Sequence, residues 1–96
     1  ADRFKVLSEP ARLQILSCLR RGEMTVSELV DATGLAQANV SKHLQALDAA
    51  GFIERRKNGL FTVCALADDD VFTLCDIMCG RLEREAARQR KALARR

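Results

Sequence analysis

The chain contains no tryptophan and no tyrosine, one proline, one histidine and four phenylalanines among its 96 residues. Its apolar content of 48% therefore comes mainly from alanine and leucine, which favours helices over a β-sandwich. With only five glycines and one proline, no linker is visible, and we expect a single domain over residues 1–96. No apolar run approaches the roughly 20 residues that span a bilayer, so we expect neither a secretory leader nor a membrane partner.

The net charge of +3 hides an uneven distribution along the chain. Residues 1–80 carry 9 basic and 11 acidic side chains, whereas residues 81–96 carry 7 basic and 2 acidic ones. The overall charge is thus weak evidence for a nucleic-acid partner, and local patches must supply that evidence. Four cysteines without a secretory context favour free thiols in a reducing cytoplasm over a disulfide framework.

Two helices joined by a tight turn are expected between about residues 25 and 50. Thr25 and Glu28 have the spacing of a capping box, which predicts that the first helix begins there. A turn containing Gly34 follows, and the second helix should run over about 36–50. Its apolar stripe, at helical spacing, consists of Val40, Leu44 and Leu47. This order is typical of a helix-turn-helix unit.

The periodicity then changes to that of strands over about residues 52–66. Asn58-Gly59 divides this segment and is a strong hairpin pattern, because both residues tolerate a positive φ at a two-residue turn. Acidic residues 68–70 favour the start of a last helix, expected over about 69–92. The predicted fold class is mainly α with a small β-hairpin, a winged helix-turn-helix in which the hairpin is the wing.

The second helix of such a unit lies in the DNA major groove, with its N-terminal half facing the base edges. Gln and Asn side chains suit adenine, Lys suits guanine or phosphate, and a small Ala permits close approach. Basic residues on the wing would contact the DNA backbone or the minor groove. The candidate DNA-binding residues are Gln37, Ala38, Asn39, Ser41, Lys42, His43, Arg55, Arg56, Lys57 and Asn58. A solvated helix face explains each of them alone, but the combination with the hairpin favours DNA.

The chain resembles the ArsR/SmtB family of bacterial repressors, closely over about residues 3–66 and in placement only for the last helix. The residues that support this resemblance are Pro10-Ala11-Arg12 with Leu13 and Ile15, Gln37 through Leu44, and Ala50-Gly51 to Gly59. Ser41 and His43 match the Ser-x-His of the family's recognition helix, whereas Leu60 and Cys64 stand where the family often has Arg and an aromatic residue. The resemblance implies a homodimer formed through the N- and C-terminal helices, and repression that an inducer releases.

The family's usual inducer sites are missing from the corresponding segments. The arsenic-type site would place cysteines near residues 27–31, which contain none, and the zinc-type site would place histidines in the last helix, which also contains none. A reactive-sulfur subgroup has a cysteine where this chain has Ser17, and Cys18 follows one residue later. The single histidine, His43, suits a groove contact or helix packing better than a metal site.

Cys75 and Cys79 are the remaining sensing candidates. Four positions apart on a helix, their Cβ atoms should lie about 5–6 Å apart, whereas a disulfide needs about 3.5–4.5 Å. Two thiolates at this spacing suit a soft metal or metalloid ion, although a metal site needs further ligands, and thiol oxidation is an equal alternative. The alternative without a sensing role is that both cysteines pack as small apolar residues in a dimer interface. The sequence therefore identifies no cofactor, and a soft metal or metalloid ion remains one of the alternatives for the inducer.

The sequence thus predicts a DNA-binding transcriptional regulator, released from an inverted-repeat operator by chemistry at cysteine thiols. Two alternatives remain open: a constitutive regulator without such an inducer, and a protein-interaction winged helix that does not bind DNA. We do not expect an enzyme, because a thiol enzyme needs a base beside its cysteine and the chain has no Cys-x-x-Cys. The basic residues 81–96 are expected to be a solvated helix end rather than a DNA-binding arm.

Overall fold

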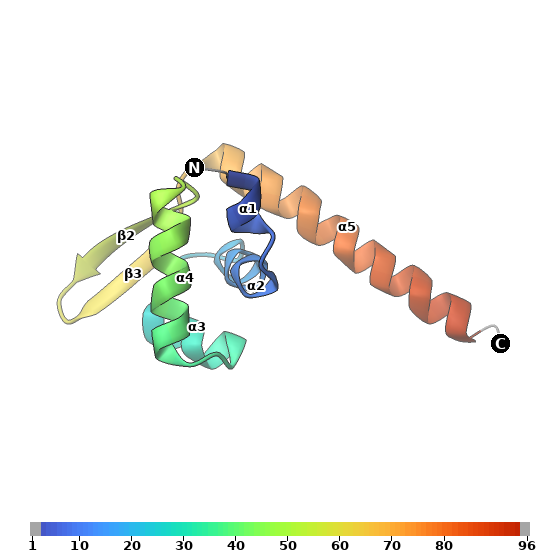
Figure 1. Ribbon diagram of the computed structural model, residues 1–96, viewed down its shortest axis with the longest axis horizontal. Helices are drawn as coiled ribbons and strands as arrows, with labels where there is room; N and C mark the ends of the chain where they lie inside the picture. The colour runs from blue at the N-terminus through green and yellow to red at the C-terminus, as the bar shows by residue number, and fades with distance from the viewer. Residues whose placement is uncertain (1–2, 95–96) are drawn as a thin grey trace.

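The computed structural model describes the backbone of residues 3–94, and it describes side chains for residues 5–78, for Gly80 and for Arg84 and Arg88. Five helices and three strands follow one another in the order expected for a winged helix-turn-helix, with one added strand (Figure 1). The elements are α1 (Arg3–Leu7), α2 (Pro10–Leu19), β1 (Met24–Thr25), α3 (Val26–Thr33), α4 (Gln37–Ala49), β2 (Ile53–Asn58), β3 (Phe61–Leu66) and α5 (Asp69–Ala94). The predicted fold class is confirmed.

The helix-turn-helix unit is formed by α3 and α4. The capping box at the start of α3 is present: the Glu28 amide donates to Thr25 Oγ1 at 3.1 Å, and the Thr25 amide donates to Glu28 Oε1 at 3.0 Å. At the other end, Gly34 adopts a left-handed φ of 73° and its amide donates to the Val30 carbonyl. A glycine suits this cap because other residues rarely adopt that conformation.

The three strands form one antiparallel sheet in the order β1-β3-β2. The sequence did not predict β1, which pairs Met24 with Cys64 and Thr25 with Val63. The expected Asn58-Gly59 turn is wrong by one residue, since Asn58 pairs with Phe61 and the two turn residues are Gly59 and Leu60. Of the two turn residues, only Gly59 has a positive φ, of 65°. This is the pattern of a type II′ turn, which needs glycine only at its first central position.

The core lies between α2, α3, α4 and the base of the sheet. The predicted stripe of α4 is confirmed, because Val40, Leu44 and Leu47 are all buried. The largest fully buried side chains are Ile15, Leu29, Leu44, Leu47, Ile53, Val40 and Cys64. Burial of this stripe fixes which face of α4 is left for solvent.

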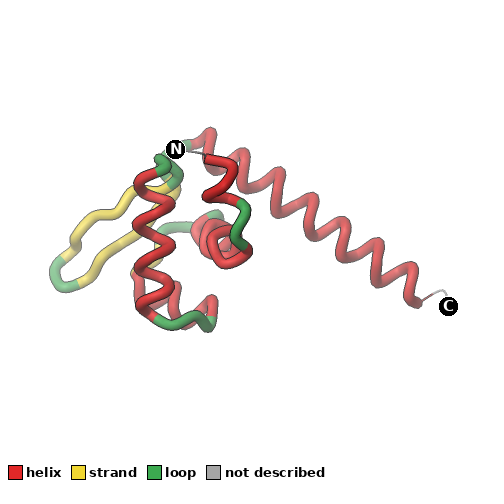
Figure 2. Tube along the Cα trace, viewed as in Figure 1, coloured by secondary structure: helices red, strands yellow, loops and turns green. Residues whose placement is uncertain are grey.

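Helix α5 begins at Asp69 and continues to Ala94, whereas the sequence predicted about 69–92. Asp68 Oδ1 accepts the Val71 amide at 2.8 Å and so caps its first turn. The first part of α5 packs against the remainder of the chain, where Val71 and Cys75 are buried, and the backbone of the helix then extends away from it (Figures 1 and 2). Among the described residues, no helix is both long and apolar enough to cross a membrane.

Candidate nucleic-acid interface

The N-terminal half of α4 presents a polar face to solvent. Burial of Val40 leaves its neighbours outside, and the exposed residues are Gln37, Ala38, Asn39, Ser41 and Lys42. Ala36 caps the helix with extended backbone and makes no side-chain hydrogen bond there, so the first amides of α4 need solvent or a ligand as partner. A helix N-terminus whose first amides have no side-chain partner attracts anions such as phosphate.

Gln45 extends this polar face and was not among the predicted site residues. It is exposed and lies one turn beyond Ser41, at the i, i+4 spacing that puts two side chains on the same side of a helix. The signal was present in the sequence as the spacing Gln37, Ser41, Gln45. An amide at this position offers the same hydrogen-bonding groups as Gln37.

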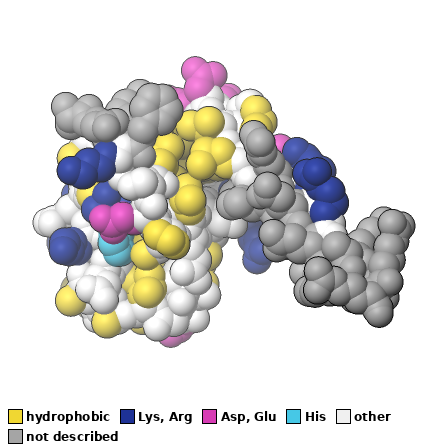
Figure 3. Space-filling view, turned by 45° about the vertical axis from the view of Figure 1, so that its right-hand side comes forward, with side chains coloured by type: hydrophobic (Ala, Val, Ile, Leu, Met, Phe, Trp, Pro, Cys, Tyr) yellow, Lys and Arg dark blue, Asp and Glu magenta, His cyan; other side chains and the backbone are white. Residues whose placement is uncertain are grey.

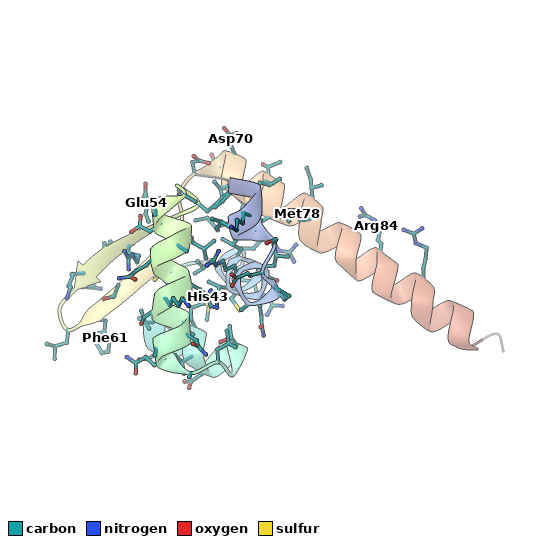
Figure 4. All side chains as sticks on the ribbon, in the orientation of Figure 1. His43, Glu54, Phe61, Asp70, Met78 and Arg84 are labelled. Atoms are coloured by element: carbon teal, nitrogen blue, oxygen red, sulfur yellow. The ribbon has the colours of Figure 1, made fainter. Side chains whose placement is uncertain are left out.

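His43 lies apart from the other predicted residues of α4. Its side chain is only 13% exposed, and its Nδ1 accepts a hydrogen bond from Arg12 Nε on α2 at 3.1 Å. Glu9 Oε2 is 3.6 Å from the same Nδ1, and Figure 3 shows the histidine among acidic and basic side chains. His43, labelled on α4 in Figure 4, therefore helps to hold α4 against the start of α2. Any contact between His43 and DNA stays a prediction.

Both predicted arginines of the wing are paired with carboxylates. Arg55 Nε donates to Asp48 Oδ2 at 2.8 Å, and the two terminal nitrogens of Arg56 donate to the two oxygens of Glu23, each at 2.8 Å. The hydrogen bonds and charge of Arg56 hold the pKa of Glu23 below its usual value, and Glu23 raises the pKa of Arg56 in return. A DNA phosphate would have to displace these carboxylates.

Lys57 and Asn58 complete the predicted wing contacts and lie next to its tip. Both are exposed, and among the described residues no ion pair or hydrogen bond of the Lys57 side chain is found. Lys57 is thus the wing cation that needs no exchange of partners before it meets a phosphate. Sequence reasoning placed all three basic residues together but could not distinguish Lys57 from the paired arginines.

The predicted sensing cysteines can be placed only in part. Cys75 is 4% exposed and lines a small apolar pocket between α1, α2, α5 and Phe52, which is the environment of the packing alternative. The Cys79 side chain lies outside the described residues, so the pair stays a prediction. Within the described part of the chain, no group of three or more potential ligands is arranged to hold a metal ion.

The other two cysteines differ sharply in environment. Cys64 on β3 is fully buried, and burial raises the pKa of its thiol, with a smaller opposing effect of the Arg55 charge. Cys18 on α2 is half-buried at a surface recess that it shares with Arg21, Glu23 and Met24. Both are free thiols, as expected for a chain without a disulfide framework.

A polar recognition helix beside a basic hairpin is the architecture of the winged helix-turn-helix transcriptional regulators. The family model described as "Bacterial regulatory protein, arsR family" matches residues 9–55. The homodimeric winged helix-turn-helix DNA-binding domain of Mb0332 from Mycobacterium bovis, a possible ArsR-family transcriptional regulator, superposes with a TM-score of 0.79 and 32% identity, covering 88% of this chain and 78% of that one. The chain belongs to the ArsR family.

Curated relatives share about two fifths of the aligned residues. The chain is 39% identical over 56 residues to the probable mercury resistance operon repressor of Streptomyces lividans. This alignment covers 58% of this chain and 45% of that protein. It is also 39% identical over 65 residues to the HTH-type transcriptional repressor SmtB of Mycobacterium tuberculosis, covering 68% and 48%. The chain thus spans less than half the length of these two relatives.

Proposed function

We propose that this chain is a homodimeric transcriptional repressor that binds an inverted-repeat operator. The observation that carries the proposal is the orientation of α4, which buries Val40, Leu44 and Leu47 and leaves the face from Gln37 to Gln45 to solvent. Such a face fits a major groove, where Gln, Asn, Ser and Lys discriminate bases. On the wing, Lys57 adds a positive charge that strengthens binding to any duplex, and Arg55 and Arg56 add theirs if a phosphate displaces their carboxylates.

The surface of α5 supports the homodimer. Leu74 and Ile77 are exposed at helical spacing, and the half-buried Met78 continues the same stripe. Hydrophobic side chains gather in the hollow between α5 and the remainder of the molecule in Figure 3. A second copy of α5 would cover this stripe, and its two-fold symmetry would place two recognition helices about 34–36 Å apart, in successive major grooves.

Release by an inducer requires a link between the sensing site and α4. Cys75 lines the same pocket as Phe52, whose amide donates to the Leu47 carbonyl at the end of α4 at 3.0 Å. A change of size or charge at Cys75 would push on Phe52 and so on the recognition helix. An inducer acts in this way if it binds the DNA-free arrangement more tightly than the DNA-bound one.

The first experiment tests DNA recognition. DNA upstream of the gene is footprinted with the purified protein, and affinity is measured by fluorescence anisotropy for Gln37→Ala and Ser41→Ala. Each variant should lose about tenfold in affinity and discriminate less between operator bases. Gln14→Ala on α2 is the matched Gln→Ala control away from α4. It removes one hydrogen bond, to the Thr33 carbonyl, so its folding is checked by circular dichroism, and it should bind as the unaltered protein does. Unchanged affinity and base preference in both α4 variants would contradict the proposal.

The second experiment tests release through thiols. Arsenite, Cd²⁺ and hydrogen peroxide are each added to the protein–operator complex, and dissociation is followed by anisotropy. The Cys75→Ala/Cys79→Ser variant should bind the operator but fail to dissociate, whereas Cys18→Ser should dissociate normally. Release that persists in the double variant would remove these cysteines from the mechanism. If none of the three reagents dissociates the unaltered protein, the constitutive regulator is the better description.

A further inference from the structure

The tip of the wing is apolar. Leu60 is fully exposed, and Phe61, labelled at the end of the hairpin in Figure 4, is 60% exposed. Single exposed apolar residues are ordinary on protein surfaces, but these two are consecutive and both lie at the tip of the hairpin. The turn itself does not require them, because Gly59 supplies its only positive φ.

One cation beside this tip, Lys57, has no carboxylate partner among the described residues, whereas Arg55 and Arg56 are paired with Asp48 and Glu23. Residues 55–67 contain three basic and no acidic side chains, and Lys57 lies beside the turn. In Figure 1 the hairpin projects beside α4 and away from α5, so the tip belongs to the same side of the molecule as the proposed DNA interface. The match to the family model ends at residue 55 and does not include the tip.

We propose that Leu60 and Phe61 form a wedge that enters the DNA minor groove beside each half-site and unstacks one base step. This proposal rests on the proposed function and assigns a role to residues outside it. A minor groove about 6 Å wide is too narrow for a whole two-stranded hairpin, so only the side chains at the tip would enter it. Leu and Phe are side chains that minor-groove proteins insert between bases.

The wedge has a consequence for sequence preference and for DNA shape. Pyrimidine–purine steps such as TA and CA unstack most easily, so the operator should contain one where the tip lies, without any hydrogen bond to its bases. Insertion from the minor groove opens the step and bends the duplex toward the major groove. Leu60 and Phe61 would then determine specificity through deformation, whereas Lys57 would contribute charge.

The test uses a duplex enriched from a random-sequence pool by the unaltered protein, with 2-aminopurine in the step that flanks each half-site. Binding should raise 2-aminopurine fluorescence, and the bend is measured by energy transfer between the ends of the duplex. Leu60→Ala and Phe61→Ala should each lower affinity about tenfold. This is the lower end of the range expected when a large apolar side chain is no longer buried on binding. Both variants should also lose most of the fluorescence change and of the bend.

Lys57→Ala is the matched control, because it lies beside the tip but removes charge rather than apolar surface. It should reduce the salt dependence of binding and keep the fluorescence change and the bend, whereas Leu60→Ala should keep the salt dependence. Thermal unfolding of Leu60→Ala should match that of the unaltered protein, since this side chain is fully exposed.

Three results would overturn the wedge while leaving the proposed function in place. The first is a Leu60→Ala protein that binds and bends the duplex as the unaltered protein does. The second is a change in the oligomeric state of free Leu60→Ala protein, which would assign the tip to contacts between copies. The third is Leu60-dependent sedimentation with phosphatidylserine vesicles. If no duplex is enriched from the pool, the proposed function fails together with the wedge.

Discussion

Arg56 on the wing donates two hydrogen bonds, each 2.8 Å long, to the carboxylate of Glu23, which precedes it by 33 positions. The pair joins β2 to the segment that leads into β1. A phosphate accepts the same fork of guanidinium donors, so Glu23 occupies the position that a DNA phosphate would take. In the DNA-free protein, the charge of this predicted contact is therefore already neutralised.

Removal of the Glu23 charge should strengthen binding to DNA of any sequence. In Glu23→Gln, Arg56 can neutralise an additional phosphate, so affinity should rise a few-fold at low salt. The slope of log affinity against log salt concentration should also steepen by about 0.9, the value for one more phosphate contact. Anisotropy titrations with a non-operator duplex over a salt series measure both effects.

Glu54→Gln supplies the control for this experiment. Glu54 is an exposed acid on β2, the strand that carries Arg56. Its substitution removes one negative charge, as Glu23→Gln does, but leaves the Arg56–Glu23 pair intact. It should leave the salt slope unchanged. An equal gain in both variants would mean that net charge, and not the Arg56–Glu23 pair, limits binding.

The contact between His43 and Arg12 predicts a role in stability. His43→Ala removes the 3.1 Å hydrogen bond between α4 and α2, so the free energy of unfolding should fall by about 1 kcal/mol. Operator base preference should stay the same, because the side chain faces α2. Urea unfolding of the single variants and of Arg12→Ala/His43→Ala gives the coupling between the two residues. A changed base preference in His43→Ala would show instead that the residue contacts bases.

Local features of this chain could be predicted from its sequence, whereas contacts between distant segments could not. The Thr25–Glu28 capping box and the apolar stripe of α4 depend on residues within one or two helical turns, and both were found. Strand β1 has only two residues and exists because β3 lies beside it. The carboxylate partners of Arg55 and Arg56, like the contact of His43 with Arg12, depend on how segments meet after folding, for which residue spacing gives no rule.

The burial of Cys64 predicts the order in which the thiols react. The thiolate is the reactive form, and burial raises the pKa of Cys64, so its thiol stays protonated at neutral pH and reacts faster only as pH rises toward that higher value. Iodoacetamide should therefore label the half-buried Cys18 at least about tenfold faster than Cys64. Mass spectrometry of peptides from timed samples gives both rates. In concentrated urea the two rates should converge, and equal rates in the native protein would contradict the buried position of Cys64.

The exposed stripe of α5 predicts the site of dimer formation. Ile77 is 60% exposed, and a symmetric contact would bury it in both copies. Ile77→Glu loses this burial twice and places two like charges together, so the dissociation constant of the dimer should rise at least about 100-fold. Phe72→Glu makes the same kind of change five positions away, about 140° around the helix axis, and should leave the dimer intact. Sedimentation velocity measures both, with circular dichroism to confirm folding. An Ile77→Glu protein that remains dimeric would place the contact between copies elsewhere.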